Sequence, residues 1–517
     1  MTERRFGWRK GSAMQLFDLI NGTEHQVLRG SVDLEVHEIR YDSRQVKPGD
    51  LFVCIGGFRR DGHDFIQAAW AAGAVAALVE RTDLTEAALQ GGTVVKVANT
   101  RQSLAAVACR FYGHPSRSLS MVGVTGTNGK TTTTYLVESV LRCAGHQVGL
   151  IGTIGYRCNE LELEAARTTP ESCDLQALLE RMARLRADSV VMEVSSHALA
   201  LHRVDGCEFD VAVFTNLTQD HLDFHGTMEA YRSAKLSMFE GLGVGSTKTT
   251  EKAAVVNLDD PAADLFLGAT RVRRYSYSVE GPADLSVADV KMGPDGIRCR
   301  LQTPWGTTAI RSPLLGRYNL SNILAAAATG LHLGADLSAV ADGIAALHHV
   351  PGRCERVETG QAFSVMVDYA HTPDALRRVL RMARQCCPGR LIVLFGCGGE
   401  RDRGKRPLMG EAALELADFT VITSDNPRGE DPHQIIEEIE TGAKKVWGQG
   451  KGYVTILDRG MAIREALSLA GRGDMVVIAG KGHETYQILR DRTIPFDDRL
   501  VAREALHELG FRRKDRV

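Results

Sequence analysis

The chain has 517 residues, a formal net charge of −2, 44% hydrophobic residues and 24% charged residues. This length predicts about three domains, and the composition predicts packed cores rather than disorder. The balanced charge provides no overall attraction for nucleic acid or for a membrane surface, so neither is expected as a partner.

The eleven cysteines are scattered without a Cys-x-x-Cys pair. This usage is typical of a reducing cytosol and argues against a disulfide framework or a cysteine zinc site, so we expect a cytoplasmic protein. No apolar run approaches the roughly 18 residues of a membrane span. Residues 1–13 are basic but lack the apolar core of a signal peptide. We therefore expect an extension without targeting function and regard Met14 as a second candidate start.

Residues 1–118 have the pattern of a small α/β domain. Strand-like apolar runs cover residues 50–55 and 74–79, and glycine-rich turns lie between them.

The most informative motif follows at residues 125–132, where the chain reads Thr-Gly-Thr-Asn-Gly-Lys-Thr-Thr. A short apolar run precedes it and a segment with helical spacing follows it. This arrangement holds a nucleotide phosphate, because backbone N–H groups and the helix N-terminus face the anion. We expect Lys130 to reach the outer phosphates of ATP or GTP and the Thr131 hydroxyl to hold Mg²⁺. The general pattern has glycine where this chain has Val124, so a chance match is the alternative.

Residues 119–350 alternate strand and helix signals, which predicts a mostly parallel sheet with crossover helices. The candidate strands lie at 190–192, 211–214 and 254–256. We expect a β insertion at 283–312 and an alanine-rich helix at 323–331.

Three polar residues of this region could serve a nucleotide site. Glu193 ends a buried strand, and ligands gather at the carboxyl ends of parallel strands. We expect the phosphate loop to lie two strands away from Glu193, so that this carboxylate can hold Mg²⁺ near the phosphates. His221 is a candidate ligand of a second cation, with a surface histidine as the alternative. By spacing alone, Lys235 is an ordinary lysine on a helix surface.

Residues 351–517 repeat the α/β rhythm after a hinge at Pro351-Gly352-Arg353. Four strand-end loops in this region carry charges of both signs, which predicts a zwitterionic ligand. The four loops contain the segments 368–371, 401–403, 425–428 and 481–484. A dinucleotide fingerprint at 396–401 is a weak alternative, because Arg401 occupies its third glycine position.

Together these motifs resemble those of the Mur ligase family, the ATP-dependent amino-acid-adding enzymes of bacterial cell-wall synthesis. The resemblance extends from about Tyr41 to Asp498, and the family itself lacks the first glycine of the phosphate motif. The motifs that carry it are Gly-Thr-Asn-Gly-Lys-Thr, Glu-Val-Ser-Ser-His, Asn-Leu-Thr-Gln-Asp-His, Tyr-x-x-Ala-Lys, Tyr-Asn-Leu-Ser-Asn, Pro-Gly-Arg and Asp-Tyr-Ala-His.

The resemblance implies an α/β protein of three domains. These are an N-terminal UDP-substrate-binding domain at 1–118, a central ATP-binding domain with a mostly parallel sheet at 119–350 and a C-terminal Rossmann-like amino-acid-binding domain at 351–517.

Within the family, the chain is similar to the members that add meso-diaminopimelate to UDP-N-acetylmuramoyl-L-alanyl-D-glutamate through an acyl phosphate. The discriminating segment is Asp-Asn-Pro-Arg at 425–428. Diaminopimelate has a carboxylate at its far end that lysine lacks, and Arg428 can pair with it.

The resemblance also assigns roles to individual residues. Contacts with ATP are implied for Gly126, Thr127, Asn128, Gly129, Lys130, Thr131, Thr132, Asn319, Asn322, Arg353 and Asp368. Contacts with the UDP-muramoyl dipeptide are implied for Tyr41, Ser43, Phe58, Arg59, Arg60, Thr168, Thr169, Ser195, Leu201 and Arg203. Contacts with diaminopimelate are implied for Arg401, Asp425, Asn426, Pro427, Arg428, Gly480 and Glu484. The implied catalytic residues are Lys130, Glu193, His221 and Lys235. Two Mg²⁺ ions are implied at Thr131, Glu193, His221 and Lys235, the lysine as a carbamate formed from CO₂.

Two other functions remain as alternatives. A folylpolyglutamate synthase shares the phosphate motif, but it generally lacks a UDP-binding domain with Asp-Ser-Arg at 42–44 and has no use for the segment 425–428. A P-loop switch protein would bind nucleotide without ligation, but it leaves the charged C-terminal loops unexplained.

Overall fold

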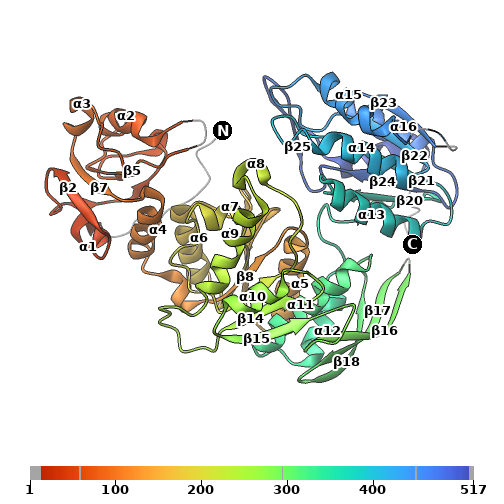
Figure 1. Cartoon of the computed structure of the whole chain (residues 1–517), viewed down its shortest axis with the longest axis horizontal. Coiled ribbons are helices and arrows are strands. Elements are labelled where there is room, and N and C mark those ends of the chain that lie inside the picture. The colour runs from red at the N-terminus through yellow and green to blue at the C-terminus, as the bar shows by residue number, and fades with distance from the viewer. Residues whose placement is uncertain (1–12, 58–59, 294, 447, 449–450, 512–517) are drawn as a thin grey trace. The chain divides into compact units, whose positions relative to one another are not determined.

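A computed structural model describes residues 13–57, 60–293, 295–446, 448 and 451–511. Two of the expected substrate residues, Phe58 and Arg59, lie outside these ranges. The chain divides into two compact units, which we describe separately. Figure 1 labels their helices and strands. The first unit contains Met1–Gly126, Ala144–Thr215 and Glu229–Ser276, and the second contains Thr127–Cys143, Asn216–Met228 and Tyr277–Val517. No helix in the described ranges is long and apolar enough to cross a membrane.

The first unit begins with a five-stranded sheet in the order β2-β7-β6-β5-β4, in which only β2 is antiparallel to its neighbour. The predicted strands at 50–55 and 74–79 are confirmed as β5 and β6. The sheet strands are β2 (His25–Arg29), β4 (Ile39–Arg40), β5 (Leu51–Val53), β6 (Ala76–Val79) and β7 (Thr93–Val97). Its main helices are α1 (Leu16–Ile20), α2 (Ile66–Ala71), α3 (Glu86–Leu89) and α4 (Thr100–Phe111).

An eight-stranded sheet follows, in the order β11-β10-β9-β12-β8-β13-β14-β15. Its strands β9, β12, β8, β13 and β14 are parallel, as the buried apolar runs predict, whereas β10 and β11 form an antiparallel hairpin at one edge. The strands are β8 (Ser120–Thr125), β9 (Val148–Ile151), β10 (Gly155–Cys158), β11 (Leu161–Glu164), β12 (Ser189–Glu193), β13 (Val211–Phe214), β14 (Ala253–Asn257) and β15 (Arg273–Tyr277). The helices that accompany this sheet are α6 (Ser172–Arg184), α7 (Ser196–Ala200), α9 (Met228–Glu240) and α10 (Ala263–Ala269).

One sequence expectation about this sheet is wrong. We expected the phosphate loop two strands away from Glu193, but β12 pairs directly with β8 and places Glu193 opposite Val124. Local sequence patterns do not specify strand order, because that order depends on how the crossover helices pack.

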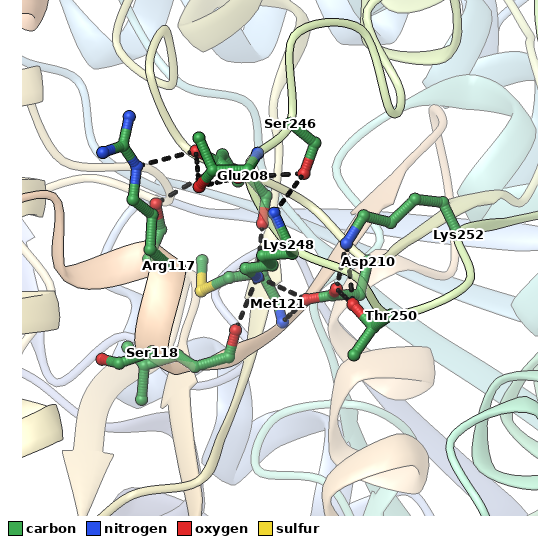
Figure 2. A network of polar contacts seen from close by, with 12 residues as sticks. Arg117, Ser118, Met121, Glu208, Asp210, Ser246, Lys248, Thr250 and Lys252 are labelled. Carbon is green, nitrogen blue, oxygen red and sulfur yellow. Dashed lines mark hydrogen bonds and ion pairs between the residues drawn. The ribbon is translucent and has the colours of Figure 1, made fainter.

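A network of charged groups anchors the amino-terminal edge of this sheet (Figure 2). Asp210, just before β13, accepts hydrogen bonds from the ammonium groups of Lys248 and Lys252 at 2.5 and 2.7 Å. It also accepts one from the Met121 N–H at 2.8 Å. The adjacent Glu208 binds Arg117 at 2.9 Å, so the network ties the segment between α9 and β14 to the start of the sheet.

The second unit contains three long helices, a small antiparallel sheet and a C-terminal α/β layer structure. The predicted β insertion is confirmed as β16 (Ser286–Gly293), β17 (Gly296–Thr303) and β18 (Gly306–Ser312). The helices that pack nearby are α5 (Lys130–Cys143), α11 (Tyr318–His332) and α12 (Leu337–Ala346), and a short helix α8 covers Leu222–His225.

The C-terminal sheet has the order β19-β20-β24-β21-β22-β23, and its strands are parallel apart from the edge strand β19. Alternate residues of each strand enter cores on opposite faces: Leu391, Val393 and Phe395 face α13, α14 and α15, while Ile392 and Leu394 face α16 and α17. The strands are β19 (Glu355–Arg356), β20 (Ser364–Asp368), β21 (Leu391–Phe395), β22 (Phe419–Thr423), β23 (Gly452–Ile456) and β24 (Met475–Ala479). The helices are α13 (Pro373–Cys386), α14 (Lys405–Leu416), α15 (Pro432–Ala443), α16 (Arg459–Ser468) and α17 (Asp498–Glu508). A hairpin of β25 (Tyr486–Ile488) and β26 (Thr493–Pro495) precedes α17.

Candidate active site

The phosphate loop connects β8 to α5, and its backbone requires glycine at two positions. Gly126 and Gly129 have φ angles of +143° and +86°, which residues with a Cβ rarely adopt. A Cβ at Gly129 would in addition lie 2.6 Å from Oδ1 of Asn322. Val124, at the position of the missing glycine, lies in the buried strand and needs no such freedom.

The segment after β13 shapes the phosphate loop. The N–H groups of Thr127 and Asn128 donate to the backbone oxygen and to Oδ1 of Asn216 at 2.8 and 2.9 Å. The Thr218 N–H donates to the Thr127 hydroxyl at 2.9 Å, and Lys130 Nζ donates to the Thr127 carbonyl at 2.9 Å. In this segment we had singled out only His221, as a ligand of a second cation or a residue that orients a phosphate, so Asn216 and Thr218 are residues that sequence reasoning missed. Their polar types after a buried strand were the available signal.

Two asparagines of α11 lie beside this loop. Asn322 Nδ2 donates to Asn319 Oδ1 at 2.8 Å, and the Thr133 hydroxyl donates to Asn322 Oδ1 at 3.2 Å. Asn319 also lines a cavity of about 710 Å³, a volume typical of small-molecule sites. Asn322 thus supports the phosphate loop, whereas the contact of Asn319 with ATP remains a prediction. Other residues of the cavity wall are Leu314, Leu315, His348, His349 and Arg353.

Arg353 and Asp368 are also brought together in the second unit. The Arg353 guanidinium donates to the Thr131 hydroxyl at 3.1 Å and lies 4.7 Å from the centre of the Tyr369 ring. Asp368 accepts the Cys354 N–H at 2.8 Å, and burial raises its pKa although the charge of Arg353 opposes this. Asp368 therefore anchors the turn that carries Arg353.

In the first unit, Glu193 lies in a pocket of hydroxyl groups. Its carboxylate is 1% exposed and accepts the Thr153 N–H at 2.8 Å and the Thr153 hydroxyl at 3.1 Å. The Thr153 and Thr168 hydroxyls are 3.0 Å apart, and the Thr169 hydroxyl donates to the Glu193 carbonyl at 2.8 Å and to Ser195 Oγ at 3.3 Å. The structure therefore brings Glu193, Thr168, Thr169 and Ser195 together, and Thr153 joins them without having been predicted.

Arg203 belongs to a cluster of three arginines around one buried carboxylate. Glu171 is 3% exposed and pairs with Arg203 at 2.9 Å, with Arg101 at 3.2 Å and with Arg167. The other arm of Arg101 donates to the Gly56 carbonyl at 2.9 Å. The three cations outnumber the carboxylate, so the cluster suits an anionic ligand. Sequence reasoning missed Glu171 and Arg101.

Four further residues expected to contact the UDP substrate lie elsewhere in the first unit. The Tyr41 hydroxyl donates to Asp174 at 2.5 Å, and Arg60 lies 6.0 Å from a neighbouring phenylalanine ring. Ser43 begins a short 3₁₀ helix, and the half-buried Leu201 follows α7. Their contacts with substrate remain predictions.

The interpretation of Lys235 as a surface lysine is wrong. Lys235 is 1% exposed, its ammonium donates to the Gly126 carbonyl at 2.8 Å and it lies 4.6 Å from the centre of the Tyr231 ring. The face of α9 that carries Lys235 is buried. The spacing of residues in a short amphipathic helix does not reveal which face of the helix that is. Lys235 therefore lies buried beside the phosphate loop, and its roles as a carbamate and as a metal ligand remain predictions.

His221 is the most exposed of the expected cation ligands, with 41% of its side chain accessible and a φ of +54°. In the described part of the chain, no group of three or more His, Cys, Asp and Glu side chains forms an all-protein metal site. Mg²⁺ does not need such a cage, because it is usually held by one or two carboxylates together with substrate phosphates. The oxygen donors of Glu193 and Thr131 fit that chemistry.

The loops after β22 and β24 form the charged site of the C-terminal layer. Asn426 Nδ2 donates to Glu484 Oε2 at 2.8 Å, and Asn426 Oδ1 accepts the Ile488 N–H at 2.9 Å. Lys481 is fully buried, and its ammonium donates to Glu484 at 2.8 Å and to Asn426 at 3.2 Å. These contacts bring two of the expected diaminopimelate residues into direct contact. Lys481 was noted only as one charge of its loop, and its buried location was not foreseen.

Arg428 lies on the other side of this site in a left-handed backbone conformation, with a φ of +52°. Its guanidinium donates to the Gly399 carbonyl at 2.9 Å. Burial lowers the pKa of Arg428, and the neighbouring charge of the exposed Arg401 lowers it further. A non-glycine residue at positive φ is costly and is found most often at functional sites.

Close backbone approaches define the rest of the pocket. Gly480 has a φ of +112°, and a Cβ there would lie 2.7 Å from Oδ2 of Asp425. A Cβ at Gly399 would collide with the Pro427 carbonyl. The closely packed loops therefore carry arginine, carboxylate and amide groups, the types that a zwitterionic ligand requires.

Three family models cover most of the chain. They are the Mur ligase family catalytic domain at residues 35–112, the Mur ligase middle domain at 124–330 and the Mur ligase glutamate ligase domain at 352–482.

Individual proteins agree with these matches. The chain is 48% identical over 474 residues to a UDP-N-acetylmuramoyl-L-alanyl-D-glutamate–2,6-diaminopimelate ligase of Geobacillus thermodenitrificans, which covers 92% of this chain and 95% of that protein. A solved structure of an enzyme with the same name has 34% identity and a TM-score of 0.67, and covers 96% of this chain and 100% of its own.

A folylpolyglutamate synthase of Mycobacterium tuberculosis, solved with ADP and AMPPCP, has 18% identity and a TM-score of 0.61 over 80% of this chain and 95% of its own. At that identity it shares the fold alone.

Proposed function

The chain belongs to the Mur ligase family, and from this premise we propose that it joins meso-diaminopimelate to the D-glutamate of UDP-N-acetylmuramoyl-L-alanyl-D-glutamate. ATP drives the reaction, and the product is a precursor of peptidoglycan. The observation that supports this choice of amino acid is that Arg428 lies on the same pair of interacting loops as Asp425, Asn426 and Glu484. The far carboxylate of diaminopimelate can pair with an arginine, whereas lysine has no such group.

The ligation proceeds in two steps. An oxygen of the D-glutamate γ-carboxylate attacks the γ-phosphorus of ATP, the bond to the ADP oxygen breaks, and an acyl phosphate forms. The amine of diaminopimelate then attacks the acyl carbon, the bond to phosphate breaks, and the nitrogen loses a proton to give the amide. No covalent protein nucleophile is required.

The chain's own groups bind and orient the reactants. The N-terminus of α5, which begins at Lys130, faces the phosphates in this proposal, and the Lys130 side chain adds a positive charge. The arginine cluster around Glu171 suits the anionic groups of the dipeptide. The hydroxyls of Thr168, Thr169 and Ser195 belong to the same compact unit of the chain.

Two Mg²⁺ ions complete this proposal, the first held by Thr131 and Glu193 and the second by His221 and a carbamate on Lys235. Bound Mg²⁺ supplies positive charge between the carboxylate and the phosphate, which otherwise repel each other. Reaction of the Lys235 amine with CO₂ turns a cation into an anionic oxygen donor. The location of the buried Lys235, whose side chain contacts the Gly126 carbonyl of the phosphate loop, supports this role.

The three regions carry separate parts of the reaction in this proposal. Residues 1–118 bind the UDP part, residues 119–350 bind ATP, and residues 351–517 bind the amino acid. The charged pocket within the last region supports its assignment.

A single omission assay tests the function. Release of ADP by the full-length protein should require ATP, the UDP-muramoyl dipeptide and meso-diaminopimelate together. ADP release without either acceptor would instead favour a nucleotide switch, and release that depends on a folate and glutamate would favour a folylpolyglutamate synthase.

A further inference from the structure

A fully buried arginine, Arg459, lies beneath the charged pocket of the C-terminal layer. It is the first residue of α16 and is 1% exposed, and its partner Asp498, the first residue of α17, is 0% exposed. The Nε and Nη2 atoms of Arg459 donate to the two carboxylate oxygens of Asp498, each at 2.7 Å. Neither residue was predicted to have a role.

The guanidinium of Arg459 also holds two backbone carbonyls. Nη1 donates to the Ser424 oxygen at 3.3 Å, and Nη2 donates to the Ala479 oxygen at 2.9 Å. Ser424 directly precedes Asp425, and Ala479 ends β24 directly before Gly480. Each carbonyl is therefore one residue away from an expected ligand of diaminopimelate.

These two carbonyls belong to strands that do not pair with each other. β21 lies between β22 and β24 in the sheet, so strand pairing does not set the distance between the bases of the loops that follow them. Farther along the loops, the Arg428 N–H donates to the Ile488 carbonyl at 3.1 Å and Asn426 contacts Glu484 and Ile488. Arg459 spans the gap between the bases of the loops. Above it, Asp425 Oδ2 approaches the Cα of Gly480 so closely that a Cβ there would lie only 2.7 Å away. A small change in loop spacing would thus move the Asp425 carboxylate relative to Glu484 and Arg428.

Stability alone does not account for this arrangement. Replacing a buried ion pair by apolar side chains of similar volume is often neutral or stabilising, because both charges lose their hydration on burial. The same two helices are already joined at the surface by Arg464 and Glu508, whose Nε and Oε2 atoms are 2.9 Å apart. What the buried pair adds is a rigid fork that satisfies two strand-end carbonyls at once.

We propose that Arg459, oriented by Asp498, is a positioning residue that sets the spacing of the two diaminopimelate-binding loops and so contributes to the choice of amino acid. The inference rests on the proposed binding of diaminopimelate at these loops. Arg459 itself is buried beneath the pocket and acts through the backbone on either side.

The test replaces the pair by apolar side chains in the full-length enzyme, as Arg459→Met with Asp498→Leu. We expect a folded protein with a melting temperature below that of the wild type, because the Ser424 and Ala479 carbonyls lose the Arg459 donor. The KM for meso-diaminopimelate should rise at least tenfold, while the KM values for ATP and for the UDP-muramoyl dipeptide stay within twofold. Discrimination against L-lysine, measured as the ratio of kcat/KM values, should fall. A matched control, Arg464→Gln with Glu508→Gln, removes the exposed pair between the same helices and should leave all three KM values unchanged.

A folded double variant with the wild-type KM for diaminopimelate would overturn the inference, and so would an equal rise in all three KM values. If the double variant does not fold, Arg459→Lys keeps the charge opposite Asp498, but one ammonium cannot replace the fork. It should show the same selective rise, and an unchanged KM would again overturn the proposal.

Arg428→Lys, measured in parallel, separates this inference from the binding site itself. If Arg428→Lys leaves the KM for diaminopimelate unchanged, the site is misplaced. If it raises that KM while the Arg459 variants do not, only the positioning role is wrong.

Discussion

At the scale of single residues, we propose that Arg428 determines which amino acid the ligase accepts. Its guanidinium is the donor that matches the far carboxylate of diaminopimelate, and a left-handed backbone conformation directs it. Part of its donor capacity is already used to hold the Gly399 carbonyl, which fixes the side chain before the ligand arrives. Such preorganisation reduces the entropy lost on binding.

We expect Arg428→Lys to weaken diaminopimelate binding, because lysine has a single ammonium and cannot form the two parallel hydrogen bonds of a guanidinium. Hydrogen bonds to charged groups contribute about 1.5–3 kcal/mol, so the KM for diaminopimelate should rise about 10- to 100-fold. Steady-state kinetics with each substrate varied in turn measures the effect. Equal losses for diaminopimelate and ATP would show that the pocket binds something else.

Lys235 is the second residue with a sharp expectation. If it acts as a carbamate, Lys235→Ala should lower kcat by about 100-fold or more, in line with the loss of one preorganised electrostatic group. Added short carboxylates should restore part of the activity of the variant. They should not increase the activity of the wild type. Full activity of Lys235→Ala without any additive would rule out the carbamate.

At the scale of elements, the network around Asp210 secures the segment that connects α9, which carries Lys235, to β14 (Figure 2). Burial disfavours the Asp210 anion, but hydrogen bonds from Lys248, Lys252 and Thr250 outweigh this effect and lower its pKa. For Glu208 the same competition lowers the pKa to about 2. A carboxylate whose folded pKa is depressed stabilises the fold above its unfolded pKa and loses that contribution as the pH falls.

Asp210→Asn should therefore lower the free energy of unfolding by about 3 kcal/mol near pH 7, because it leaves two buried lysines without their counter-charge. The difference from the wild type should shrink as the pH falls below about 4, where the unfolded carboxylate becomes protonated. Denaturant unfolding at a series of pH values measures both effects. The control is Asp83→Asn, which removes an exposed partner of Arg81 and should change the free energy of unfolding little. A pH-independent difference would contradict the assigned role of the charge.

The elements that sequence predicted best are the buried parallel strands. The run Val211–Phe214 is apolar at every position, as a strand covered on both faces must be, and it is confirmed as β13. The sequence could not show that Lys235 is buried, since burial depends on which face of α9 meets the phosphate loop. Nor could it reveal Arg459, which lies far along the chain from the two carbonyls it holds.

For the whole molecule, the proposed mechanism requires an acyl phosphate that survives until the amine arrives. Acyl phosphates react with water, so the enzyme must exclude water from the intermediate or delay its formation. The two substrates of the second step are bound by different regions of the chain in this proposal. Coupling between them is therefore a property of the complete protein.

We expect ATP hydrolysis without diaminopimelate to be a small fraction of the complete reaction, even when the UDP-muramoyl dipeptide is saturating. Release of phosphate and ADP, followed with and without diaminopimelate, measures the coupling. Rapid hydrolysis in the absence of the amino acid would contradict the protection of the intermediate.

The most direct test of the central claim is the mass of the product formed from the UDP-muramoyl dipeptide and ATP with an equimolar mixture of meso-diaminopimelate, L-lysine and L-glutamate. The structure predicts that mass spectrometry will detect predominantly the diaminopimelate adduct, with loss of one water per bond formed. A product that contains mainly lysine or glutamate would contradict the account.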